Sequence, residues 1–252
     1  MNVRKNALKL TAAERQNFTN AINRLNSGPQ PTRYAQFVAV HLANHHQHGL
    51  MPDGTDEVGV QRFLTWHRAF LLEFERALQQ IDPTVTVPYW NWMAPNSRRV
   101  PPWLAQVTPT VNVPAPSGGG HMGHGSAGAT GAQVITVFRE EGAGGALPSA
   151  TWVKNFLLQP PLTFTLFTSR FEGVHGMVHN YVGGTMATFS SPADPVFWMH
   201  HAQCDRLWAG WQAKVANAGK WPSLANAAAT MDPWNWIATE LRSIQERGYS
   251  YQ

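Results

Sequence analysis

The sequence predicts a mainly α-helical fold with a four-helix-bundle core, long loops and little β-structure. Apolar residues recur at helical spacing in several segments, and capping or breaker residues bound these segments. The 252 residues suit one large domain, so we expect residues 1–252 to form a single domain. Aromatic residues make up 11% of the chain and charged residues only 13%, which excludes a largely disordered protein.

The first three helices are expected in the N-terminal third. Residues 11–14 form a capping box, which begins an amphipathic helix that the breaker at 27–29 ends. A second helix is expected over about 32–48, where a following glycine can end it. A third runs over about 64–81 and stops before the proline at 83.

The rest of the chain alternates loops and helices. Residues 94–131 are rich in Pro and Gly and are expected to form an irregular loop. Beyond it we expect a short strand at residues 134–139. Four helices should follow, at residues 149–158, 172–182, 195–218 and from Asp232-Pro233 onward. The helix over 172–182 should end at Gly183-Gly184.

Charge and hydropathy exclude two classes of partner. The net charge is +4, but the basic residues are scattered and form no stripe, so we expect no nucleic-acid partner. The apolar runs are only a few residues long, so we expect no membrane span. The first 15 residues lack an apolar segment of signal-peptide type. The default location is therefore cytoplasmic, and a secreted protein whose leader was removed stays open.

Histidines gather in four of the expected helices. His175 and His179 are four residues apart, which puts both rings on one helix face where a single metal ion can join them. His67 lies on the apolar face of another helix, and a third carries the pair at 200–201. Four more histidines crowd residues 41–48. Any one of them alone could equally be a hydrogen-bonded core residue.

A shared metal centre accounts for these histidines together. Each buried imidazole requires a hydrogen-bond or metal partner, and helices that converge on one centre satisfy several at once. Cys204 is the one cysteine, which excludes internal disulfides and four-cysteine sites. Imidazole suits zinc, copper, iron and nickel; structural zinc prefers cysteine and the non-haem iron triad needs a carboxylate. Six imidazoles could hold two copper ions in a dinuclear centre.

Two long motifs carry a resemblance to a known family. Residues 63–75, FLTWHRAFLLEFE, resemble the first copper-site signature of tyrosinases, roughly F-L-P-W-H-R-x-x-L-x-x-x-E. Residues 194–206, DPVFWMHHAQCDR, resemble the second, D-P-x-F-x-x-H-H-x-x-x-D. Shorter matches lie between them in the same order, at residues 88–92, 175–179 and 183–186. The chain over about 1–245 is thus similar to tyrosinases, catechol oxidases and molluscan-type haemocyanin units.

The resemblance implies two copper ions that bind O₂ between them as peroxide. It implies that copper B is held by His175, His179 and His201, the second member of its histidine pair. It implies that copper A is held by His41, His67 and one further histidine.

The middle copper A ligand departs from the family pattern. Many members place it at the position that Val58 occupies here. We therefore expect His48, with His45 as the alternative and His46 after it. His200 is then a histidine that supports the site.

The resemblance also suggests roles around the copper ions. Glu172 matches a family glutamate that orients a water molecule, and this water takes the proton of a monophenol. Equally, Glu172 could be an acidic residue near a helix N-terminus, where the helix dipole stabilises its charge. Several tyrosinases have Asn where Gly176 stands, which puts strong monophenol hydroxylation in doubt. Asn180 could substitute for it or simply face solvent. Gly176, Met186 and Phe197 are candidates for the substrate pocket, although the last two could equally be core.

Arg68, Asp205 and Arg206 are expected to form ion pairs between the copper helices. Some members join a cysteine to a copper A histidine through a thioether. Cys204 lies far from that stretch, so we expect no such link.

The implied function is a copper-dependent polyphenol oxidase, which uses O₂ to oxidise o-diphenols, and in tyrosinases also hydroxylates monophenols, to o-quinones. The implied partners are small phenolic substrates and O₂, with a copper-delivering helper protein as a further candidate. One alternative is an o-aminophenol oxidase at the same site. The other is a haemocyanin-like oxygen carrier. Carriers commonly have a further domain that covers the site, and we expect no C-terminal shielding domain here.

Overall fold

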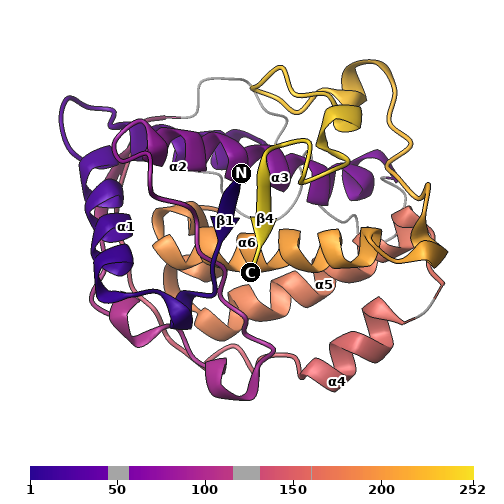
Figure 1. The fold of residues 1–252 in the computed structure, drawn as a ribbon. Coiled ribbons are helices and arrows are strands. Elements are labelled where there is room, and N and C mark those ends of the chain that lie inside the picture. Colours follow the sequence, from indigo (N-terminus) through magenta and orange to yellow (C-terminus); the bar gives the residue numbers. More distant parts are fainter. Residues whose placement is uncertain (45–56, 116–130, 160) are drawn as a thin grey trace.

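Four long helices form the centre of the molecule. The computed structural model describes residues 1–44, 57–115, 131–159 and 161–252. The central helices are α2 (Arg33–Asn44), α3 (Glu57–Gln79), α5 (Phe164–Val182) and α6 (Pro195–Gln212), with α1 (Ala12–Leu25) and α4 (Ala150–Val153) outside them (Figure 1). The predicted mainly helical fold is confirmed.

Aromatic rings join the central helices. Phe74 of α3 stacks on Trp198 of α6, with 3.6 Å between ring centroids. Phe37 of α2 lies edge-on to both rings. Phe167 of α5 stacks on Trp211 of α6 at 4.2 Å. These rings are almost completely buried, and their packing fixes the four helices relative to one another.

The first helix begins as predicted. The backbone N–H of Glu14 donates to the Thr11 hydroxyl over 3.2 Å, and the Thr11 N–H donates to the Glu14 carboxylate over 2.8 Å. This reciprocal capping box satisfies two backbone donors that the helix itself cannot. The buried face of α1 consists of Phe18, Ala21, Ile22 and Leu25.

Side chains also cap the two helices that carry the histidine pairs. The Thr163 hydroxyl accepts from the Leu166 N–H over 3.2 Å, so α5 begins at Phe164 rather than at the expected 172. The extra turns form because Phe164 and Phe167 are buried against α6. The helix ends at Gly183, as predicted, where φ is +65°. At the start of α6 the Asp194 carboxylate accepts a hydrogen bond from the backbone N–H of Val196 over 2.8 Å.

Two further boundaries and one expected helix were wrong. α3 begins at Glu57 rather than at 64, and α6 ends at Gln212 rather than at 218. No helix begins at Asp232-Pro233. The Asp232 carbonyl accepts instead from the indole N–H of Trp66 over 2.7 Å, which holds this stretch as a turn against α3.

The β-structure is small. β1 (Asn2–Arg4) pairs in parallel with β4 (Tyr249–Tyr251), and both lie across the central helices (Figure 1). β2 (Thr110–Val113) pairs antiparallel with β3 (Gln133–Thr136). β3 was predicted, but β2 lies in a stretch expected to be irregular. It forms because Val111 and Val113 alternate into the core.

Short helical turns complete the described residues. A π-helical segment, Lys154–Leu158, continues α4. The 3₁₀ turns are Ala7–Lys9, Pro95–Ser97, Pro102–Leu104, Gly184–Ala187, Ser191–Ala193, Val215–Asn217, Asn226–Ala229 and Ala238–Leu241. None of the helices in the described residues combines the length and the apolarity that crossing a membrane requires.

A buried charge cluster joins α3, α6 and the β1–β4 pair. The Asp205 carboxylate lies 2.5 Å from Arg68 Nε and 3.3 Å from an Arg4 nitrogen. The hydroxyls of Tyr249 and Tyr251 donate to it over 2.7 Å and 2.5 Å. The expected pairing of Arg68 with Asp205 is confirmed.

Arg206 behaves differently from its expected role. Its guanidinium lies 4.7 Å from the centroid of the Tyr89 ring and 3.5 Å from the side-chain oxygen of Gln203. It is partly exposed and takes no part in the ion pairs found among the described residues.

Candidate metal centre

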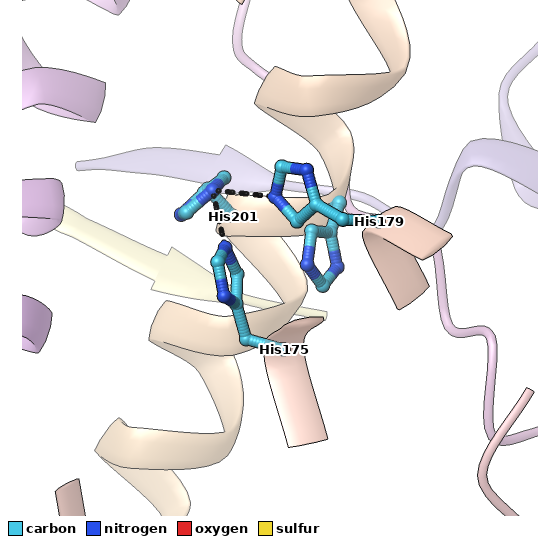
Figure 2. Close-up of side chains that lie close together, drawn as sticks. His175, His179 and His201 are labelled. Atoms are coloured by element: carbon cyan, nitrogen blue, oxygen red, sulfur yellow. Dashed lines mark hydrogen bonds between the residues drawn. The ribbon is translucent and has the colours of Figure 1, made fainter. Parts of the chain in front are cut away.

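Four histidines from two neighbouring helices meet in the core. His175 and His179 come from α5 and His201 comes from α6 (Figure 2). His200 also lies on α6, directly before His201. Each offers a ring nitrogen, and these four atoms lie within 4.8 Å of one another. The i, i+4 spacing on α5 therefore places both rings on one face, as the sequence predicts.

Three of these rings point their Nε2 atoms at one another. His201 Nε2 lies 3.1 Å from His175 Nε2 and 3.5 Å from His179 Nε2 (Figure 2). Two imidazole nitrogens that share one ion at about 2.0–2.1 Å lie about 3.3 Å apart when the bonds are near tetrahedral. The observed separations bracket that value, so the three nitrogens fit a single metal ion.

Hydrogen bonding explains which nitrogen faces the centre. His179 Nδ1 lies 2.6 Å from the carbonyl oxygen of Met186. A carbonyl only accepts, so Nδ1 carries the proton and the lone pair is on Nε2. His201 Nδ1 is buried and has no hydrogen-bond partner among the described residues. The close Nε2 atoms of the three rings can share either a proton or a cation, and an all-imidazole set of this kind suits a metal ion.

His200 is held in a different way. The indole N–H of Trp92 donates to His200 Nδ1 over 3.1 Å, and a further hydrogen bond joins the ring to the backbone of His175. The His200 ring on α6 is therefore hydrogen-bonded to Trp92 and to the backbone of α5 at His175. The supporting role of His200 stays a prediction. The buried thiol of Cys204 lies 3.9 Å from both ring nitrogens of His200.

Two further histidines lie against the first group. His41 of α2 and His67 of α3 have ring centroids 6.0 Å apart. His41 Nδ1 lies 2.8 Å from the carbonyl oxygen of Phe189, and His67 Nδ1 lies 2.8 Å from that of Phe63. Both rings therefore carry the Nδ1 proton, and their Nε2 lone pairs are the ones suited to metal. The His67 ring stacks on that of His201 at 4.1 Å.

The structure thus gathers five of the six expected ligands in one place. The sixth was expected to be His48, with His45 and then His46 as alternatives. All three lie outside the described residues. Val58, which occupies the position of the family ligand, is 46% exposed at the start of α3.

Burial keeps these imidazoles neutral. Burial lowers the pKa of His179 to about 4. The pKa values of His67, His200 and His201 lie well below the ordinary value, first because of burial and second because neighbouring histidines would repel a charge. Neutral imidazole is the form that binds metal, so the site is ready for a cation near neutral pH.

The other predicted residues lie on the histidine helices or in the turn between them. Glu172 is half-buried on α5, in the turn before the first histidine, and Asn180 is exposed on the same helix. Gly176 is partly exposed, and a Cβ added there would meet no atom within 4 Å. Met186 and Phe197 are completely buried, and the Phe197 ring centroid lies 4.1 Å from that of His201.

Sequence reasoning missed the groups that orient the rings. Three of them are the backbone carbonyls of Phe63, Met186 and Phe189, and every residue type carries such a group. The fourth, Trp92, lies in a motif that drew attention only as part of the resemblance. The one usable signal for the carbonyls at 186 and 189 is Gly183-Gly184, which marks a turn immediately after the histidine helix.

The donor set favours copper. The described group consists of imidazole nitrogens alone, with neither a thiolate nor a carboxylate among its members. Such a set suits copper better than structural zinc, magnesium or calcium.

Comparisons with known proteins point to one family. The common central domain of tyrosinase matches residues 31–127 and 139–214. The chain is 37% identical to a tyrosinase of Streptomyces lincolnensis over an alignment that covers 93% of each protein. It is 28% identical to a haemocyanin of Enteroctopus dofleini, covering 83% of this chain and 18% of that one. Its fold is similar to that of a tyrosinase from Burkholderia thailandensis, with a TM-score of 0.68, 14% identity and coverage of 100% of this chain and 75% of the other.

Proposed function

The chain belongs to the tyrosinase family and is a type-3 copper oxidoreductase, and we propose that it uses O₂ to oxidise o-diphenols to o-quinones at a dinuclear copper centre. The observation that carries the proposal is the convergence of the Nε2 atoms of His175, His179 and His201, with His41 and His67 beside them. Tyrosinase-like phenol oxidation follows from the family, whereas the diphenol preference is our inference.

The proposed ligands divide between the two ions. His175, His179 and His201 would hold copper B. His41 and His67 would hold copper A together with one histidine of residues 45–48. When bound, the two ions supply the electrons that reduce O₂ and take two electrons from the phenol.

The chain's own groups prepare the ligands. The carbonyls of Met186, Phe189 and Phe63 keep the Nδ1 protons of three histidines in place, so that Nε2 is the ligating atom. The Phe197 ring lies against histidines of both proposed sites, 4.1 Å from His201 and 5.3 Å from His41 between centroids. A completely buried apolar ring in this position excludes water from the inner side of the centre.

Substrate would approach from the side of α5. Gly176 is partly exposed, the space at its Cβ position is open, and Met177 beside it is exposed. Met186 and Phe197 are buried, so in our proposal they form the floor of the pocket. We propose that Glu172 receives the proton of a monophenol through a water molecule. Asn180, exposed on the same helix, is the candidate for holding that water in place of an asparagine at 176.

The test compares three substrates under air on copper-loaded protein: a monophenol, the matching o-diphenol and the matching o-aminophenol. We expect two copper ions per chain and rapid quinone formation from the diphenol. Slow conversion of the monophenol would support the inference that glycine instead of asparagine at position 176 weakens monophenol hydroxylation. Preference for the o-aminophenol would replace the proposed substrate, and O₂ binding without turnover of any substrate would make the protein an oxygen carrier.

A further inference from the structure

We propose that the segment 183–189 is a single positioning element that orients one histidine of each copper site. The inference rests on the proposed function for the division of the histidines between two copper ions. It adds a role for backbone carbonyls that neither motif contains. It also predicts that damage to this one segment weakens both sites together.

Two carbonyls of the segment hold rings from different helices. The Met186 carbonyl oxygen lies 2.6 Å from Nδ1 of His179, which is on α5 in the copper B group. The Phe189 carbonyl oxygen lies 2.8 Å from Nδ1 of His41, which is on α2 in the copper A group. Each contact fixes both the tautomer and the rotation of its ring. The two carbonyls are only three residues apart, so one local conformation determines both.

Hydrogen bonds anchor the segment to a neighbouring strand end. The backbone N–H of Thr185 donates to the Phe138 carbonyl over 3.0 Å, and the Phe138 N–H donates back to the Thr185 hydroxyl over 3.1 Å. The hydroxyl and the backbone N–H of Thr188 both donate to the Thr185 carbonyl, over 2.9 Å and 3.2 Å. Thr185 is only 3% exposed, so this anchor lies inside the protein.

Glycine is required where the segment begins. Gly183 has φ +65° and Gly184 has φ +53°, a region that residues with a side chain rarely adopt. A Cβ on Gly184 would lie 2.3 Å from the Phe138 carbonyl oxygen, which is closer than any real contact. A side chain at 184 must therefore displace the segment from Phe138 and move both orienting carbonyls with it.

The consequence of such a shift is predictable. Without their acceptors, the rings of His41 and His179 can take either tautomer and can rotate. Groups that orient metal-binding imidazoles typically contribute about 10–100-fold to metal affinity. Because both carbonyls belong to one segment, we expect losses of this size at copper A and copper B alike.

The first experiment compares the wild-type chain with Gly184→Ala. Histidine ¹⁵N NMR of the metal-free protein at neutral pH reports the tautomers, and titration with copper(I) against a chromophoric chelator reports the two affinities. We expect Nδ1–H tautomers for His41 and His179 in the wild type and mixed tautomers for both in the variant, with each affinity at least tenfold lower. The matched control is Gly210→Ala in α6, where a Cβ meets nothing within 4 Å. It should change neither measurement.

A second variant protects the test against simple unfolding. Thr185→Val keeps the shape of the buried side chain but removes the acceptor of the Phe138 N–H. We expect a smaller loss, again at both sites, in a protein whose circular dichroism is that of the wild type. Loss at one site alone, or unchanged tautomers and affinities in both variants, would overturn the inference. A wild-type protein that binds fewer than two copper ions would contradict the proposed function instead, and the tautomers would still decide the positioning role.

Discussion

The imidazole rings of His67 and His201 lie parallel, with 4.1 Å between their centroids and 14° between their planes. They come from α3 and α6, and in our proposal they belong to different copper ions. One residue further along α3, Arg68 binds Asp205, which is one helical turn beyond His201. The ion pair and the stacked rings therefore fix the same helix contact, and this contact sets the spacing between the two sites.

The two histidines of the pair at 200–201 should respond differently to substitution. We expect His201→Ala to bind only one copper ion at any copper concentration and to lose quinone formation. His200→Asn should still bind two ions at saturating copper, with affinity lower by about 10–100-fold, because it removes a supporting contact rather than a ligand. Metal analysis across a copper titration distinguishes them. A two-copper His201→Ala protein would remove that residue from the ligand set.

Single alanine substitutions of His45, His46 and His48 should identify the remaining copper A ligand. We expect His48→Ala to lose one copper ion and the other two variants to keep both. Copper content per chain and oxygen consumption with a diphenol are the measurements. If all three variants keep two ions and full activity, the ligand lies elsewhere in the chain.

A side chain at position 176 should change the relative turnover of monophenols and diphenols. A Cβ at this position meets no atom within 4 Å, and we expect the amide of an asparagine there to hold the water beside Glu172. We expect Gly176→Asn to raise the ratio of monophenol to diphenol turnover several-fold. Gly210→Asn, also at an unobstructed helix position, is the control for the effect of asparagine on the helix. Equal ratios in the wild type and Gly176→Asn would count against this water-holding role.

The buried carboxylate of Asp205 predicts a pH-dependent stability. Burial alone would raise the pKa of this carboxyl, but the charges of Arg68 and Arg4 and the hydrogen bond from Tyr251 outweigh it and lower the pKa below the ordinary 3.8. The folded protein therefore gains stability from the carboxylate above the unfolded-state pKa, and it loses this gain as pH falls through the lowered value.

We expect Asp205→Asn to lower the free energy of unfolding by about 3–5 kcal/mol at neutral pH, because it leaves the buried Arg68 without its counter-charge. The difference from the wild type should be equal at pH 7 and 5 and smaller at pH 3.5. Urea unfolding of both proteins at the three pH values measures it. A difference that grows toward low pH would mean that another group dominates.

The histidines of the site were predicted more accurately from the sequence than the helix boundaries and the backbone groups that orient the histidine rings. The motifs around His67, His175 and His201 specify side chains at helical spacing, and such spacing determines which rings share a face. The convergence of these rings was predicted for that reason. Boundaries were less accurate: α5 extends back to Phe164 because tertiary packing on α6 buries the additional turns. The Met186 and Phe189 carbonyls could not be predicted, because their role depends on backbone direction and not on residue type.

The pairing of β1 with β4 has a consequence for the order of events during synthesis. Arg4 contacts Tyr251 across a sequence separation of 247 residues and Asp205 across 201. A nascent chain that emerges from the ribosome thus contains all the histidines of the centre before β4 exists. Closing so long a loop adds only a modest entropy cost, which rises with the logarithm of its length, but it can happen only after translation has passed Tyr251. The buried carboxylate of Asp205 on α6 therefore acquires its hydrogen bonds from Tyr249 and Tyr251 last.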